Sequence, residues 1–224
     1  MNRFLLSTLA MLTVVCGVQA HFVFLITSED QSSLKVVLSD GLDVDDGIDA
    51  AKIAGTKLFL RGPDGKDSPL TTKASAHHLD VALPGKGPRL VFGTTDYGVL
   101  QKGDAKPFQL KYHSKTIIGE CTKANTKVGE ALPVEIIPTL DGGKVRFQFL
   151  AKGKPVADVE MNMLLPADKK EKVKTDKEGF TQWFDAKGRY GAWSRHSETV
   201  SGETGGKKFE EIRHYATLVV DVAK

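Results

Sequence analysis

The 224-residue sequence has few cysteines and no excess of charge of one sign. It contains two cysteines, Cys16 and Cys121, and the first lies inside an apolar run at the N-terminus. The remaining single cysteine cannot form an internal disulfide, so a disulfide-stabilised scaffold is excluded and stability has to come from a packed core. The formal net charge is only +3, and the lysines are scattered. Proteins that bind nucleic acid favour dense basic stripes, so we expect no nucleic-acid partner.

The common catalytic motifs are also missing. The chain has no Gly-rich phosphate loop, no nucleophile elbow, and no Cys-x-x-Cys or His-Glu-x-x-His pattern. Each of these motifs places reactive groups at the spacing that its chemistry needs, so each absence weakens an enzymatic interpretation. No internal repeat and no low-complexity tract is present. We therefore expect a protein that is not an enzyme.

The first 20 residues have the pattern of a cleavable secretory signal. Arg3 supplies a positive start, residues 4–15 are almost entirely apolar, and Val18-Gln19-Ala20 ends with small residues where a signal peptidase cuts. The run is shorter than the roughly 20 apolar residues of a membrane span, and no later stretch is apolar enough to be one. We expect cleavage after Ala20 and a periplasmic or secreted protein that is not embedded in a membrane. Lipidation at Cys16 is the alternative, which the residues before it fit poorly.

Short β-type runs dominate the chain after residue 20, whereas helical periodicity is weak. Alternating apolar and polar residues over 79–83 and 145–149 are typical of half-buried strands, and further short strands are predicted over 22–26, 34–38, 57–61, 89–92, 108–112 and 180–184. Gly62-Pro63-Asp64-Gly65 predicts a tight turn, and Asp96-Tyr97-Gly98 predicts another. Only residues 45–54 favour a helical turn. The polar stretch 121–131 carries little strand signal and is the predicted domain boundary. The expected fold is all-β, with two consecutive immunoglobulin-like or transthyretin-like sandwiches over residues 21–131 and 132–224, the second of them transthyretin-like.

The residue at the predicted new N-terminus is a histidine, His21. A terminal histidine offers two nitrogens, the α-amine and the ring Nδ1, which together close a chelate ring on a metal ion. The amine titrates near 8 and imidazole near 6.5, so both are available to a competing metal at neutral pH. A further imidazole would complete a nitrogen-rich site that suits Cu(II) or Ni(II). The alternative is that the signal is cut before an arbitrary residue.

Two other histidines are candidates for the third nitrogen. His214 shares its phase with the apolar residues of a strong strand over 212–222, so we expect it to point inward. A lone inward histidine is more often a hydrogen-bonded core residue than a ligand. His196 lies at a strand end, on the face opposite Trp193. The other histidines have weaker claims as ligands: His77 and His78 at a solvated strand entry, and His113 on the polar face of its strand.

Several short segments resemble an exported family of domains of unknown function that is linked to accessory components of nickel uptake. The segments are His21-Phe22-Val23-Phe24-Leu25, Asp96-Tyr97-Gly98-Val99, Tyr112-His113-Ser114-Lys115, Thr175-Asp176-Lys177-Glu178-Gly179-Phe180, Gly191-Ala192-Trp193 and Arg213-His214-Tyr215-Ala216-Thr217-Leu218. The resemblance implies two consecutive β-sandwiches, an extracytoplasmic location and handling of a transition metal, and it implies no established enzymatic activity. His21 and His214 match histidines typical of that family.

The leading functional hypothesis is therefore an extracytoplasmic protein that binds or delivers a transition metal ion, Cu or Ni. The expected ligands are His21 with His214 or His196, and the expected partner is a membrane metal transporter or another envelope protein. Such a site requires the first strand to meet the last. A second hypothesis is a non-catalytic interaction module that binds a protein or a glycan. A copper monooxygenase is disfavoured, because the phenylalanines lie mostly in core phase rather than on a flat surface.

Overall fold

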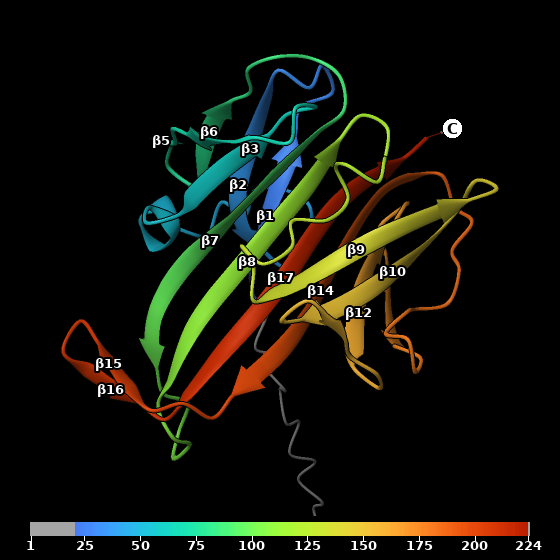
Figure 1. Cartoon of the computed structure of the whole chain (residues 1–224). Coiled ribbons are helices and arrows are strands. Elements are labelled where there is room, and N and C mark those ends of the chain that lie inside the picture. The colour runs from blue at the N-terminus through green and yellow to red at the C-terminus, as the bar shows by residue number, and fades with distance from the viewer. Residues whose placement is uncertain (1–20, 224) are drawn as a thin grey trace, which may run out of the picture.

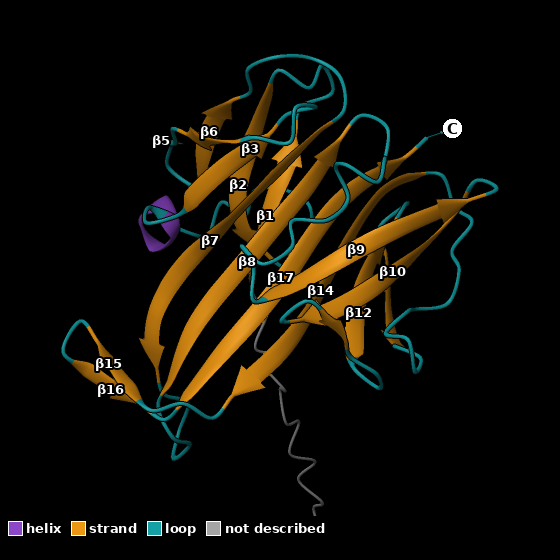
Figure 2. Cartoon of the chain, viewed as in Figure 1, coloured by secondary structure: helices purple, strands orange, loops and turns teal. Residues whose placement is uncertain are grey.

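The computed structural model describes residues 21–223, so the predicted signal peptide, residues 1–20, lies outside the described residues. The predicted all-β class is confirmed, since strands make up 56% of the chain and helix 2%. Figure 2 shows one short helical element beside the sheets, the 3₁₀ turn η1 (Ala50–Ile53), within the stretch expected to turn. Within residues 21–223, no helix has the length and hydrophobicity to cross a membrane.

An eight-stranded sheet forms the centre of the molecule (Figure 1). Its strands, in spatial order, are β13 (Lys169–Lys174), β12 (Glu160–Leu165), β14 (Gly188–Glu198), β17 (Glu211–Val222), β8 (Phe108–Ile118), β7 (Arg89–Leu100), β3 (Lys57–Arg61) and β4 (Asp67–Leu70).

Smaller sheets accompany the central one. One has four strands in the order β1 (Phe22–Thr27), β2 (Ser33–Ser39), β6 (His78–Ala82) and β5 (Lys73–Ala74). Another has three, in the order β11 (Lys154–Pro155), β10 (Lys144–Ala151) and β9 (Val134–Asp141). A separate hairpin is formed by β15 (Gly202–Thr204) and β16 (Lys207–Phe209).

The two halves of the chain share the central sheet. Strand β8 comes before the predicted domain boundary and β17 is the last strand, yet they pair in parallel over ten residue pairs. Figure 1 shows these two strands, green and red, side by side along their length. The chain thus forms two layers packed on one common sheet, and the expected division into two consecutive sandwiches stays a prediction. Independent folding of residues 21–131 and 132–224 remains a prediction.

Strand alternation divides the interior into two cores, one on each face of the central sheet. On β8, Phe108, Leu110 and Tyr112 pack in the core formed with β1 and β2, whereas Ile117 packs in the core formed with β9 and β10. Successive side chains of a strand point to opposite faces, so a sheet covered on both sides buries every position. This explains why the apolar and polar residues of β8 are almost equally inaccessible.

The stretch predicted as a polar boundary is packed against the sheet. Val128, within this stretch, and Leu132, directly after it, are buried in the second core. The backbone amides of Val128 and Gly129 donate to the carboxylate of Glu135, which also forms a buried ion pair with Lys115, Nζ to Oε1 2.6 Å. These contacts fix the connection between β8 and β9 to strands on both sides of it.

Two other segments differ from the predicted strands. Residues 180–184 form only isolated bridges, Val145 with Phe184 and Gln148 with Phe180, rather than a strand. The polar pattern of strand β13, which carries Lys169, Lys170, Lys172 and Lys174, does not predict a strand. It lies at the edge of the central sheet, where lysines are common because they discourage pairing with other chains.

Candidate metal centre

Hydroxyl groups of the central sheet anchor the start of β1. The Tyr112 hydroxyl donates to the carbonyl oxygen of His21 at 3.0 Å, and Ser114 and Thr217 both donate to the carbonyl of Val23, at 2.8 and 2.6 Å. Burial raises the pKa of Tyr112, which keeps this hydroxyl protonated and able to donate. Strand β1 is at an edge of its own sheet, so these bonds satisfy carbonyls that no neighbouring strand reaches. The backbone of His21 is therefore held in a fixed place.

A carboxylate orients the ring of His21. The Nε2 atom lies 2.8 Å from Oδ2 of Asp45, and the other oxygen of Asp45 accepts the backbone N–H of Gly47 at 2.8 Å. These two hydrogen bonds, the one from Gly47 first, lower the pKa of Asp45, so the group is an ionised acceptor at neutral pH. A carboxylate only accepts, so Nε2 carries the hydrogen, and Nδ1 of the neutral ring keeps its lone pair.

Aromatic rings pack around the residue that follows His21. The ring of Phe22 stacks on Trp193, with centroids 3.8 Å apart, and contacts Tyr215 at 5.4 Å. Tyr215 in turn packs against Tyr112 at 5.8 Å. These rings come from β1, β14, β17 and β8, so contacts between four strands fix the position of the start of β1.

A pocket of about 210 Å³ opens beside His21. Its lining residues are mostly aromatic and aliphatic, with the two cations Lys102 and Arg213: His21, Phe22, Leu38, Tyr97, Leu100, Lys102, Phe108, Leu110, Tyr112, Arg213 and Tyr215. Tyr97 and Leu100 share this face because a β-bulge between Asp96 and Gly98 shifts the register of β7. Residues 96–98, expected to form a turn, instead make this bulge, with Gly98 at φ 98° and its N–H bonded to Asp96.

The structure does not bring His214 or His196 to His21. Tyr215 lines the pocket beside His21, and its neighbour His214 therefore points to the opposite face of the central sheet. His196 is paired with His214 across β14 and β17, which places its side chain on that same far face. The expected three-nitrogen site with His214 or His196 is thus not assembled, because adjacent positions of one strand face opposite sides.

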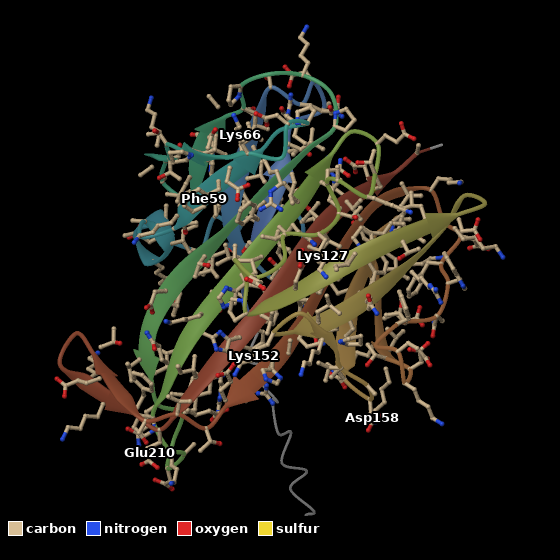
Figure 3. The ribbon with its side chains drawn as sticks, in the orientation of Figure 1. Phe59, Lys66, Lys127, Lys152, Asp158 and Glu210 are labelled. Atoms are coloured by element: carbon tan, nitrogen blue, oxygen red, sulfur yellow. The ribbon has the colours of Figure 1, made fainter. Side chains whose placement is uncertain are left out.

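His214 is buried and hydrogen-bonded, as a lone inward histidine usually is. Its Nδ1 lies 2.9 Å from Nε2 of His113, and Nδ1 of His113 lies 3.2 Å from the Thr94 hydroxyl. On the other side, Nε2 of His214 is 3.8 Å from Glu198, which also pairs with Lys152, labelled in Figure 3. His113, expected on a polar face, is 3% exposed.

Burial controls the charge of this histidine pair. It lowers the pKa of His113 to about 3, with a smaller contribution from His214, and it also lowers the pKa of His214. Both rings are therefore neutral at physiological pH, and each is one link in a chain of hydrogen bonds. Burial also raises the pKa of the half-buried Cys121 to about 11, so this thiol is protonated at neutral pH and is a poor metal ligand.

No group of three or more His, Cys, Asp or Glu side chains within residues 21–223 is arranged to hold a metal ion. A two-nitrogen chelate at His21 needs one residue and no cluster, and it depends on the predicted cleavage after Ala20, which would convert the backbone nitrogen of His21 to an amine. Sequence reasoning missed Asp45, and it placed the buried His113 on a polar strand face. Asp45 lies in a polar loop 24 residues from its partner, and nothing local distinguishes it from Asp43 or Asp46.

Comparisons with known proteins identify the family and little more. No curated protein matches the sequence. Two solved structures share low similarity with the chain. One is the BSP domain of a biofilm-associated protein, with 11% identity, 91% of this chain and 29% of that chain covered and a TM-score of 0.20. The other is a pullulanase from Anoxybacillus sp. LM18-11 complexed with maltotetraose, with 13% identity, 77% and 22% covered and a TM-score of 0.21. The chain therefore spans less than a third of either.

The family model of a domain of unknown function, DUF4198, matches residues 18–198, which include the anchored His21, the bulge of β7 and most of the central sheet. The chain belongs to this family.

Proposed function

We propose that the protein binds a transition metal ion, Cu(II) or Ni(II), outside the cytoplasm through the α-amine and Nδ1 of His21. The observation that carries this proposal is the hydrogen bond between His21 Nε2 and Asp45. It selects the ring tautomer that leaves Nδ1 free, which is the nitrogen that forms a chelate with the α-amine. Metal-binding histidines usually donate their other ring N–H to a carboxylate or carbonyl in this way.

The fixed backbone of His21 adds to this support. The Tyr112 hydroxyl holds the carbonyl of His21, and Asp45 holds its ring, so both ends of the chelating residue are oriented before a metal arrives. A preoriented chelate loses less conformational entropy on binding. The amine becomes a ligand only when the chain begins at His21, because in a longer chain the same nitrogen is an amide without a basic lone pair.

Two nitrogens leave the remaining coordination positions of the metal open. An incomplete site favours exchange of the ion over permanent storage, which agrees with delivery to a partner in the envelope such as a membrane metal transporter. His214 and His196 have no part in this two-nitrogen site, since they lie on the other face of the central sheet.

The test is a metal titration of matched forms of the protein. The mature chain beginning at His21 is compared with the same chain extended by one N-terminal residue and with Asp45→Ala. We expect one metal ion per mature chain, loss of most affinity in the extended form, and a decrease of about 10- to 100-fold for Asp45→Ala. Asp43→Ala, in the same loop, is the control and keeps the affinity of the mature chain.

Equal affinities of the mature and extended forms would exclude the His21 chelate. The non-catalytic interaction module, which binds a protein or glycan partner, would then be the better hypothesis. N-terminal sequencing of the exported protein checks the premise that the mature chain begins at His21.

A further inference from the structure

The two nitrogens of His21 leave coordination positions of the bound metal empty. Cu(II) and Ni(II) with nitrogen ligands favour square-planar or tetragonal geometry, so two further in-plane donors are needed. Among the described residues, His21 belongs to no group of three or more His, Cys, Asp or Glu side chains that could hold a metal ion. The missing donors must then come from water or from a ligand that the protein holds next to the metal. This inference rests on the proposed function.

The pocket beside His21 has the size and charge to hold such a ligand. Its volume of about 210 Å³ is below the range of roughly 300–1,000 Å³ typical of drug-sized ligands. Its lining contains Lys102 and Arg213 and no carboxylate. A small anion is the complementary occupant, and a peptide or an oligosaccharide is too large for the space.

Arg213 is oriented for this role. Its Nε and Nη2 atoms form a forked pair with Glu211, at 3.1 and 3.0 Å, and its guanidinium lies 3.6 Å above the ring of Phe108. The remaining nitrogen, Nη1, takes no part in that pair. The side chain is thus held in one orientation, with a donor left for a carboxylate oxygen.

The walls of the pocket favour a flat ring. Tyr97 and Tyr112 meet edge to face with centroids 5.9 Å apart, and Tyr215 lies 5.8 Å from Tyr112. Offset and edge-to-face arrangements of this kind are the preferred contacts between aromatic groups. An aromatic carboxylate therefore matches both the rings and the cations of the pocket.

We propose that a small aromatic carboxylate that chelates metals binds in this pocket and supplies the remaining ligands of the ion held by His21. The protein then takes up its metal as a ternary complex with a low-molecular-weight chelator. One carboxylate and a ring nitrogen of the chelator coordinate the metal, and a second carboxylate contacts Lys102 and Arg213.

The test uses pyridine-2,4-dicarboxylate as the probe, with picolinate, which lacks the second carboxylate, for comparison. Copper binding by the mature protein is measured first without either compound, so a failure of the proposed function is detected separately and would overturn this inference with it. The copper-loaded protein is then titrated, and gel filtration with visible and electron paramagnetic resonance spectra separates a protein-bound ternary complex from free chelated copper.

We expect a ternary complex with the dicarboxylate that forms more tightly than with picolinate. Lys102→Gln removes a positive charge from the pocket without adding a metal-binding carboxylate, and it should weaken the ternary complex about tenfold. Lys86→Gln, at another exposed loop lysine, is the control, and copper binding alone is measured for both variants. Removal of copper from the protein without a ternary spectrum would overturn the proposal, as would equal affinity of the Lys102→Gln and control variants for the dicarboxylate.

Discussion

The buried pair of His113 and His214 makes stability sensitive to mild acid. In the unfolded chain a histidine has a pKa near 6.5, whereas burial lowers the pKa of His113 to about 3 in the folded protein. Between these values the unfolded state binds one proton more than the folded state. The free energy of unfolding therefore falls as the pH drops below about 6.5, and it is fully retained above that value.

The size of the effect follows from the same shift. One proton changes the free energy of unfolding by about 1.4 kcal/mol for each pH unit inside the window. For His113 alone, the loss between pH 7 and pH 5 is about 2 kcal/mol, and His214, whose pKa is also lowered, adds to it. This is a large part of the total stability of a domain, which is typically about 5–15 kcal/mol.

Urea unfolding of the mature protein and of His113→Gln at pH 7 and pH 5 measures this contribution. We expect the variant to lose about 2 kcal/mol less than the original protein between the two pH values, whatever its stability at pH 7. Ile117→Val, on the same strand and facing the same core, is the control, and it should lower stability equally at both pH values. An identical pH-dependent loss in His113→Gln and the original protein would refute the argument.

Further predictions concern the buried ion pair, the tether of the first residue and the connection between the halves. Lys115→Met should destabilise the protein by about 3–5 kcal/mol because it leaves the Glu135 carboxylate buried without its partner, and Lys115→Met with Glu135→Leu should recover much of that loss in urea unfolding. Tyr112→Phe should lower stability by about 0.5–1.5 kcal/mol and weaken copper binding in a metal titration, because the carbonyl of His21 loses its donor. Limited proteolysis of the native protein should spare residues 121–133, and rapid cleavage there would contradict the packing of this stretch.

Local pattern was enough to predict much of the secondary structure. Strand β3 has the predicted bounds, and β1, β2 and β10 differ from prediction by one or two residues at an end. Each is short, apolar or alternating, and bounded by residues that favour turns. Strands β7 and β8 run well beyond their predicted ends. Their continuations contain polar residues, which suggest a loop in the sequence, although most of them are covered by other parts of the folded chain. Alternation of apolar and polar residues identifies a half-buried strand well, but it identifies a strand covered on both faces poorly.

The pairing of strands in the central sheet could not be predicted from the local sequence pattern. The parallel pairing of β8 with β17 joins segments about one hundred residues apart, and no local signal specifies such a partner. The same pairing determines which side chains lie near His21. The prediction that His214 points into the protein was correct. The sequence could not show that His214 faces one core while His21, at the start of β1, lies on the other face of the central sheet. Asp45, the partner of His21, was missed for the same reason, because a loop 24 residues away reaches His21 only in the folded chain.

Under the proposed function, the location of His21 would link metal binding to export. Its carbonyl and its ring nitrogen are bound by Tyr112 and Asp45, and neither bond uses the backbone nitrogen. The predicted cleavage after Ala20 would therefore change one atom of the proposed site, from an amide nitrogen to an amine with a lone pair, while its ring and carbonyl are already oriented. If the proposal is right, the protein would gain its chelate only after a signal peptidase has acted. The unprocessed chain would then not capture metal in the cytoplasm, and an uncleaved form would fold around the same hydrogen bonds and still lack the site.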